Sequence, residues 1–205
     1  MEMNRYIIIG RKKTAILYNN KSVEQILNVH STYNIGDIYL GQVVNILSNL
    51  NVAFIKLNKW EQNGFMILKN ESYLNNNARL GEDIVVQVMK EPISRKGPTV
   101  TRDIILENEN IKIHSYNRNN IVFGKTFNFS DKQYLRTITT LVKPKKIGIE
   151  IEKKEKKINI WEIVKNLRKL EKQSLLIEKK IRKIHNSPCL ISPKQGIIEI
   201  ILKKN

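Results

Sequence analysis

A short apolar segment at residues 52–57 carries the first candidate for chemistry, an aromatic ring beside a lysine. Side chains alternate between the two faces of a β-strand. Phe54 and Lys56 therefore share one face, and the alternating residues are uniformly apolar and belong in a core: Ala53, Ile55 and Leu57. A ring displayed next to positive charge is typical of a surface that stacks bases and attracts phosphates. The segment predicts a nucleic-acid contact at Phe54 and Lys56.

Acidic residues that could hold a metal ion are the second kind of candidate. A Mg²⁺ site for phosphodiester hydrolysis needs carboxylates that converge. Asp37 and Asp83 precede β-rich runs, and Asp131 stands at a predicted helix start, so each has a local role in a turn or a helix N-terminus. The histidines have no acidic or cysteine partner at a ligand spacing: His30, His114 and His185. We predict no metal site and no catalytic residue.

The elements that must position the ring and the lysine are five β-rich runs between Ile35 and Leu106. The runs are rich in Val and Ile and are separated by Gly, Asn and Lys. Short strands at this spacing predict a small closed antiparallel barrel.

Several segments of this region resemble the OB-fold RNA-binding domain of the ribonuclease E/G family: G-D-I-Y-L-G-Q-V, A-F-I-K-L, N-G-F and K-E-P-I-S-R-K-G-P-T-V-T. They follow in the family's order and at nearly its spacing. A weaker likeness extends from Met3 to Leu202. The resemblance implies that two aromatic residues and a lysine of the barrel grip single-stranded RNA, at Phe54, Phe65 and Lys96.

The residues alone support these three positions unequally. Phe54 has the alternation argument, whereas Phe65, after Gly64 at a strand start, fits a core position equally well. An exposed lysine is ordinary in the turn at Lys96, so that assignment rests on the resemblance. Four further basic residues are expected to strengthen the positive field: Lys56, Lys59, Arg95 and Arg102.

The resemblance also implies the domain order of an α+β fold. Residues 1–33 are expected to begin a ribonuclease-H-like subdomain, and residues 34–107 to form the five-stranded OB-fold barrel inserted in it. Residues 108–187 resemble the family's sensor of a 5′-monophosphate end. Residues 188–205 are expected to resume the ribonuclease-H-like subdomain, truncated. The family's metal-binding aspartates lie C-terminal to all of these segments, so the resemblance implies Mg²⁺ for catalysis but no ligands in this chain.

The sequence predicts further strands at residues 6–9, 14–18 and 23–29, then at 111–116 and 121–127 around a polar turn, and at 147–151. Ser130 and Gln133 form a capping-box signature for a helix that Pro144 stops. A closing hairpin is expected from residues 189–191 and 196–202.

The longest helix is predicted from Ile160 to Ile184, with apolar residues alternately three and four apart. That spacing permits a coiled-coil dimer. Trp161, Val164, Leu175 and Leu176 widen the apolar stripe, which favours packing on a sheet of the same chain. Both alternatives stay open at the level of the sequence.

One position departs from the family. Where the family has an Arg-Thr pair after an apolar strand, this chain has Glu152 and Lys153. A carboxylate repels a phosphate, and lysine lacks the bidentate fork of arginine. We therefore expect no 5′-phosphate site here.

The net charge of +17 and the pI of about 9.9 favour a polyanionic partner. The single cysteine, Cys189, excludes an intramolecular disulfide. No apolar run has the roughly 18 residues of a membrane helix, and we expect a soluble chain without a membrane partner. The abundance of Lys, Ile and Asn is typical of AT-rich genomes and favours the plastid stroma if the chain is organelle-encoded, and otherwise the cytoplasm.

Two functions stay open. In the first, a ribonuclease E/G-like protein binds single-stranded RNA and serves endonucleolytic processing of primary transcripts, and its catalytic half is either a separately encoded partner or missing. In the second, a non-catalytic module tethers or chaperones RNA. A third interpretation is a coiled-coil interaction protein that uses residues 160–184. The sequence predicts neither the RNA target nor the oligomeric state.

Overall fold

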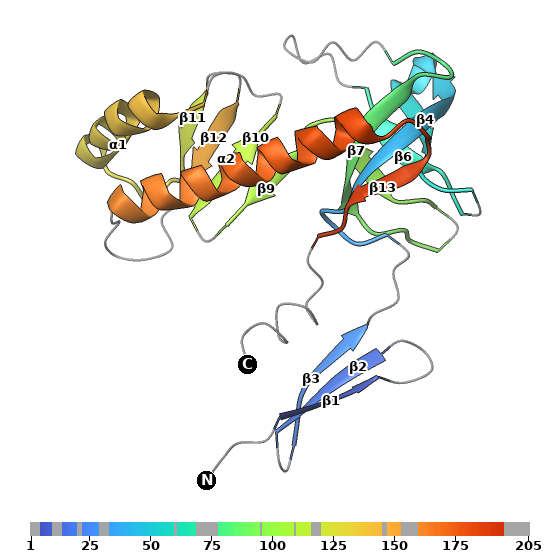
Figure 1. The fold of residues 1–205 in the computed structure, drawn as a ribbon, viewed down its shortest axis with the longest axis horizontal. Coiled ribbons are helices and arrows are strands. Elements are labelled where there is room, and N and C mark those ends of the chain that lie inside the picture. Colours follow the sequence, from blue (N-terminus) through green and yellow to red (C-terminus); the bar gives the residue numbers. More distant parts are fainter. Residues whose placement is uncertain are drawn as a thin grey trace.

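Figure 1 shows the computed structural model of the chain. The structure describes residues 5–9, 14–19, 22–28, 33–59, 61–68, 78–94, 96–108, 110–115, 120–144, 147–152 and 160–194, the first three ranges by their backbone. Those three are β1 (Arg5–Ile9), β2 (Thr14–Asn19) and β3 (Ser22–Asn28), which pair antiparallel in chain order. The three strands predicted for this part of the chain are confirmed.

A closed five-stranded barrel follows. Its strands are β4 (Ile38–Leu47), β5 (Val52–Lys56), β6 (Gly64–Ile67), β7 (Asp83–Lys90) and β8 (Thr99–Thr101). They hydrogen-bond in the order β4-β5-β6-β8-β7, and a β4–β7 pairing closes the ring. β6 and β8 are parallel, and the other pairs are antiparallel. This is the OB-fold arrangement, so the predicted fold is confirmed.

A second sheet begins directly after the barrel. Its strands are β9 (Ile105–Glu107), β10 (Ile111–His114), β11 (Ile121–Phe123) and β12 (Gly148–Ile151), in the order β11-β12-β10-β9. The strands expected at 111–116 and 121–127 are present but do not pair with each other, because β12 lies between them. Residues 105–107 thus pair in this sheet and not in the barrel.

Helix α1 (Phe129–Val142) ends before Pro144 as predicted, but its start differs from the prediction. The N-cap is Asn128, whose side-chain oxygen accepts a hydrogen bond from the Asp131 backbone N–H at 2.7 Å. Asparagine is as good an N-cap as serine. The capping box expected at Ser130 is therefore wrong, and Ser130 lies inside the helix.

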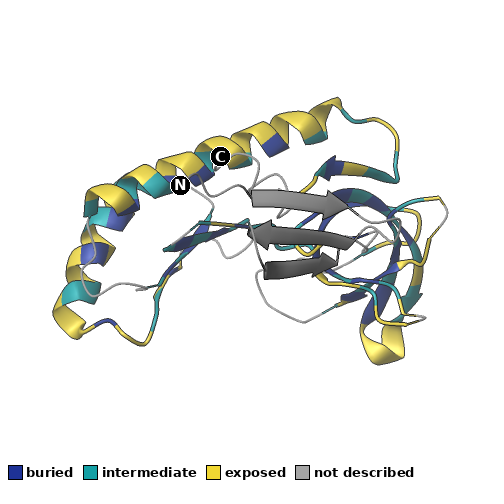
Figure 2. Ribbon diagram, turned by 90° about the horizontal axis from the view of Figure 1, so that it is seen from below, coloured by how far each residue is buried: buried dark blue, intermediate teal, exposed yellow. Residues whose placement is uncertain are grey.

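Helix α2 (Ile160–Lys183) runs across the second sheet towards the barrel (Figure 1). It packs on β9, β10 and β13 of the same chain and buries the apolar side chains that have heptad spacing: Ile163, Leu167, Leu170 and Ile177. A coiled-coil dimer through this stripe is excluded because the stripe is already covered. The argument from a widened stripe is wrong in detail, since Trp161 is 80% exposed and Leu175 and Leu176 are about half exposed. Figure 2 shows the outward face of α2 exposed along the helix.

Strand β13 (Cys189–Ser192) pairs antiparallel with the start of β4, and Cys189 stands opposite Leu40 in the register. It extends the barrel sheet by one strand. Burial raises the pKa of the Cys189 thiol, in keeping with a structural side chain. The hairpin partner expected at 196–202 lies outside the described residues. Across the described part of the chain, no helix combines the length and apolarity needed to cross a membrane.

Candidate nucleic-acid interface

The two aromatic residues singled out in the barrel are cross-strand neighbours. Phe54 on β5 and Phe65 on β6 stand opposite each other in the antiparallel register. Their ring centroids are 6.0 Å apart and the planes meet at 75°, an edge-to-face pair. Both are half-buried, while their neighbours Ala53, Ile55 and Met66 are buried in the barrel core. Phe65 therefore lies on the outer face, which the sequence alone left open.

Gly64 explains why the second ring can lie there. A Cβ on Gly64 would meet side-chain atoms of Leu57 and Val100 at 3.1–3.3 Å, so the inward position before Phe65 has little room for a side chain. Inside and outside alternate from that point along β6, from buried Gly64 to half-buried Phe65 to buried Met66. The ring is held outward because its two neighbours are held inward.

Lys96 lies on a short turn attached to the Phe65 strand. The backbones of Ile93 and Lys96 exchange two hydrogen bonds, at 3.2 and 3.0 Å, and the Phe65 N–H donates to the Pro98 carbonyl at 2.8 Å. Gly97 lies between Lys96 and Pro98. A Cβ on Gly97 would lie 1.9 Å from the Asn63 carbonyl oxygen, so this close approach of the two backbones requires glycine. The turn thus presents the exposed Lys96 beside the strand that carries Phe65.

The other expected cations divide into two kinds. Lys56 is half-buried two positions beyond Phe54, and Lys59 is exposed just after it. Arg102, by contrast, donates to the Glu82 carboxylate at 2.9 Å with only 14% of its side chain exposed. Its charge is already paired, so it adds little to the field at the rings. Arg95 lies outside the described residues.

Two tyrosines that the sequence-based prediction leaves out support the segment between β5 and β6. Tyr33 is buried, packs edge-on against Tyr39 with centroids 5.6 Å apart, and accepts a hydrogen bond from the Asn58 amide at 2.9 Å. Burial raises the pKa of Tyr39 to about 12 and that of Tyr33 further, so both phenols are neutral. They fix the chain just after Lys56. Tyr39 lies within β4 and Tyr33 just before it, so the available signal was two aromatic residues at the start of the first β-rich run.

Two of the aspartates expected to have local roles make contacts with distant parts of the chain as well. Asp37 is buried and accepts from the backbone N–H groups of Asn34 and Lys194 at 2.9 and 2.8 Å. The Ser187 hydroxyl donates to Asp83. Among the residues that the structure describes, no three acidic, histidine or cysteine side chains are grouped to hold a metal ion. The described residues therefore do not fit the Mg²⁺ implied by the family, and no hydrolytic step can be derived through them.

A further aspartate, Asp103, has no role in the sequence-based prediction and forms a cluster with His114. Its carboxylate lies 2.7 Å from the His114 Nδ1, and the Ser115 hydroxyl donates to it at 3.4 Å. Glu150 lies 3.6 Å from the other ring nitrogen. The hydrogen bond to Asp103 raises the pKa of His114, against the opposing effect of burial. Only strand pairing brings these residues together, so their spacing in the sequence gives no signal.

The cluster borders a cavity of about 280 Å³ between the barrel, the second sheet and α2. Its floor is mostly aliphatic, with Val85, Leu106 and Ile113 among the lining residues. Its two basic side chains are Arg102 and His114, which already face Glu82 and Asp103. The cavity offers no unpaired cation for an anionic ligand within the described residues that line it.

Glu152, the departure from the family's 5′-end sensor, is also engaged. Lys112 Nζ lies 2.9 Å from its carboxylate and 3.9 Å from that of Glu150. The hydrogen bond to Glu152 raises the pKa of Lys112, so this lysine stays charged and paired. Lys153 lies outside the described residues. The described part of this surface pairs its cation with two carboxylates, and no described group there is arranged as a phosphate clamp.

Comparison with known proteins shows which proteins this chain is similar to. The chain is 28% identical to the Ribonuclease E/G-like protein of Pyropia yezoensis over 98% of its own length and 41% of that protein. It is 29% identical to the Ribonuclease E/G-like protein of Porphyra purpurea, over 92% of this chain and 38% of the relative. Ribonuclease E of Synechocystis sp. matches at 25% over 98% of the chain and 31% of its own length. The chain belongs to the ribonuclease E/G family.

The family assignment made from the barrel segments is confirmed. No general family model matches the chain. The chain spans about two-fifths of the length of the two ribonuclease E/G-like relatives. The activity of the whole relatives is therefore a matter of proposal for this chain, whereas its family and its barrel are established.

Proposed function

We propose that this ribonuclease E/G-family chain binds single-stranded RNA across β5, β6 and the turn before β8. The proposal rests on one observation: Phe54 and Phe65 lie side by side on the outer face, beside the turn that presents Lys96. In OB-folds, the face of the second and third strands and the loop between the fourth and fifth bind oligonucleotides. β5, β6 and the 91–98 turn occupy those places here.

The rings and the lysines have different tasks in this proposal. Each exposed aromatic edge or face offers a base a stacking partner worth about 1–3 kcal/mol, and every base can stack. Lys96 and Lys56 attract phosphates and so hold the backbone near the rings. Binding of this kind tolerates many sequences, because every base has a face on which an aromatic ring can stack.

The biological role we propose is participation in endonucleolytic RNA processing, supported by the ribonuclease names of the relatives. Mg²⁺ and a catalytic half would then come from residues outside those described. Relatives in red algae and cyanobacteria are consistent with a plastid origin, and we propose the plastid stroma as the site of action. The second candidate is a non-catalytic RNA tether, which the absence of a carboxylate cluster among the described residues keeps open.

The test is the binding of labelled single-stranded RNA to Phe54→Ala and Phe65→Ala. Each change should weaken binding by about 1–3 kcal/mol, roughly 5- to 150-fold, and leave the fold intact because neither ring fills the core. Phe129→Ala is the matched control, since this phenylalanine is 74% exposed on α1. It should leave affinity unchanged.

A sharp loss of thermal stability with unchanged affinity would place Phe54 or Phe65 in the core and contradict the proposal. Affinity should also be the same for RNA with a 5′-monophosphate and a 5′-triphosphate. A clear preference for the monophosphate would show a sensor that Glu152, paired with Lys112, does not account for.

A further inference from the structure

The outward face of α2 has a charge pattern that RNA binding at the barrel does not use. Opposite the buried stripe of Ile163, Leu167 and Leu170, exposed basic residues recur once per helical turn: Lys165, Arg168, Lys172, Lys179 and Lys183. Helical residues three, four and seven apart share a face. The row is interrupted once, by Leu175 and Leu176. The five cations therefore form a line along the helix, which we call the α2 basic row.

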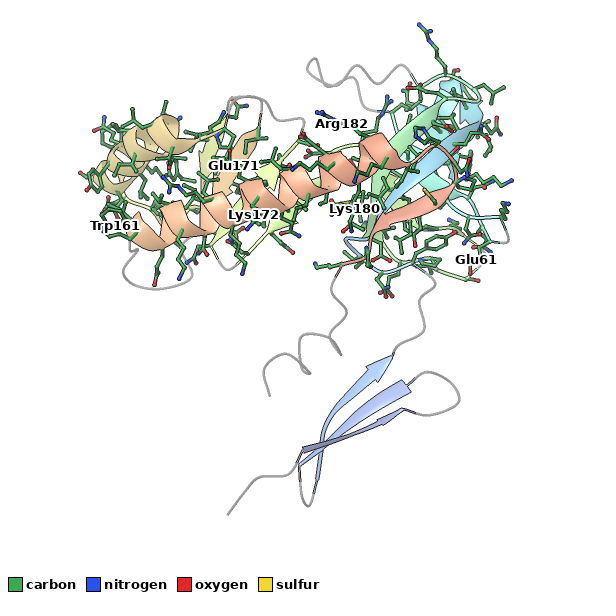
Figure 3. The ribbon with its side chains drawn as sticks, viewed as in Figure 1. Glu61, Trp161, Glu171, Lys172, Lys180 and Arg182 are labelled. Atoms are coloured by element: carbon green, nitrogen blue, oxygen red, sulfur yellow. The ribbon has the colours of Figure 1, made fainter. Side chains whose placement is uncertain are left out.

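Carboxylates do not neutralise this row. α2 contains three glutamates, Glu162, Glu171 and Glu178, and helical periodicity places them towards the edges of the outward face. In Figure 3, Lys172 and Lys180 lie along one edge of the ribbon and Glu171 along the other. Within the described part of the chain, the ion pair of α2 is Arg182 with Glu178 at 4.0 Å, and neither belongs to the row.

The length and spacing of the row fit a linear polyanion. A helix of 24 residues is about 36 Å long, with one turn every 5.4 Å or so. Nucleic-acid phosphates follow one another every few ångströms, so one strand can meet several successive lysines. A small anion or a single acidic side chain would engage only one of them.

A membrane surface fits less well. A helix that lies in a bilayer interface buries a broad apolar face. The apolar face of α2 is covered by β9, β10 and β13, which leaves Trp161, Leu175 and Leu176 as the large apolar side chains exposed on this helix. The outward face is thus suited to electrostatic contact along its length and not to insertion.

The row also leads towards the barrel face. α2 is followed by β13, which pairs with β4, and β4 pairs with β5, the strand that carries Phe54. The end of α2 therefore leads into the sheet that displays the rings. We propose that the α2 basic row is a second, sequence-independent contact for the RNA backbone, distinct from the barrel rings. It rests on the proposed function in taking RNA as the polyanion.

The experiment compares Lys172→Gln/Lys179→Gln with a matched control, Lys125→Gln/Lys132→Gln, which removes the same charge near the start of α1 and outside α2. Affinity for a 5-nucleotide and a 25-nucleotide single-stranded RNA is measured from about 0.05 to 0.3 M salt. For the long RNA, the α2 variant should have a salt slope shallower by about 1.4, which corresponds to roughly 25-fold weaker binding near 0.1 M. The short RNA should bind equally to both variants through the barrel.

The outcomes separate this proposal from the proposed function. Equal slopes for the α2 variant and its control on the long RNA overturn the basic row, even if Phe54→Ala weakens the short RNA as expected. A loss confined to the α2 variant supports the row even if the Phe54 test fails. Loss of binding to vesicles of anionic phospholipid, with RNA affinity retained, would assign the row to a membrane surface and also overturn the proposal. Circular dichroism checks that both variants stay folded.

Discussion

The barrel and the second sheet use their basic side chains in opposite ways. Around the rings of Phe54 and Phe65, Lys56 and Lys96 make no ion pair with any other described residue. On the second sheet, Lys112 and His114 each face carboxylates, at 2.9 Å from Glu152 and 2.7 Å from Asp103. These cations of the first surface are unpaired among the described residues, whereas those of the second are paired within the protein.

This difference shows why the net charge of +17 is a poor guide to a binding surface. A cation with a carboxylate at hydrogen-bond distance must lose that partner before it can bind a phosphate, whereas an unpaired lysine loses only water and counterions. The location of the carboxylates therefore decides where a polyanion can bind. By that criterion the barrel face and α2 are favoured over the second sheet.

The largest loss of stability is expected from a charge placed inside the barrel, because the barrel face can bind only if its inner and outer side chains are strictly separated. Ile55 is fully buried, so Ile55→Asp should bury an unpaired carboxylate and destabilise the fold by more than about 4 kcal/mol. The chain should be largely unfolded by circular dichroism at 25 °C. Ile67→Asp on β6, where the side chain is 50% exposed, is the control and should stay folded. A folded Ile55→Asp protein would break the assignment of faces.

The second sheet depends on α2 for its core. Leu167 is 1% exposed and packs within the cluster that joins the helix to Ile113 and Ile151. Leu167→Ala should lower the free energy of unfolding by about 2–5 kcal/mol. Leu176→Ala, at a side chain 53% exposed on the outward face, should change it by less than about 0.5 kcal/mol. Urea denaturation measures both, and equal losses would mean that α2 is packed differently.

Gly97→Ala tests whether the Lys96 turn is fixed beside the rings. The added methyl would overlap the Asn63 carbonyl oxygen, so the turn must move, at a cost of about 1–3 kcal/mol in stability. RNA affinity should fall as Lys96 leaves its place. Gly124→Ala, whose methyl would find ordinary contacts at 3.7 Å and beyond, is the control for the same change in the second sheet region. Unchanged affinity in Gly97→Ala would remove Lys96 from the interface.

The smallest effect concerns pH. The Asp103 hydrogen bond raises the pKa of His114 in the folded state above its ordinary value of about 6.5. The stabilisation is then complete below about pH 6.5 and is lost as the pH rises through the folded-state pKa. Asp103→Asn should flatten the decline in stability above that pH. The denaturation midpoint is measured against pH for the original chain and for Asp103→Asn. Parallel profiles would contradict a stabilising hydrogen bond between Asp103 and His114.

The sequence predicts those features that local periodicity controls. The alternation in residues 52–57 correctly predicts the buried set Ala53, Ile55 and Leu57, although Val52, on the opposite face, is also buried. The heptad spacing predicts which face of α2 is buried. Trp161 misled the argument because a large apolar residue is as permissible on the surface as in a core.

Contacts between residues that lie apart in the sequence could not be predicted from local periodicity. Nothing in the spacing of Asp103 and His114 shows that they meet, because the β9–β10 turn and its register bring them together. In the same way β12 inserts between β10 and β11 by a parallel contact that local sequence does not encode. The position of Phe65 was undecided for a related reason, since it depends on the lack of space at Gly64 inside the barrel.

The pairing of β13 with β4 has a consequence for how the chain is made. β5 pairs with β4 from Gln42 onward, so β13 covers the earlier part of that strand, and Asp37 binds a backbone N–H 157 residues away. A nascent chain on the ribosome must expose this edge until nearly 190 residues have emerged. Unpaired edges invite association with other chains. The strand that completes the barrel sheet is thus the last strand of that sheet to be synthesised, and until then the start of β4 is open to pairing with other strands.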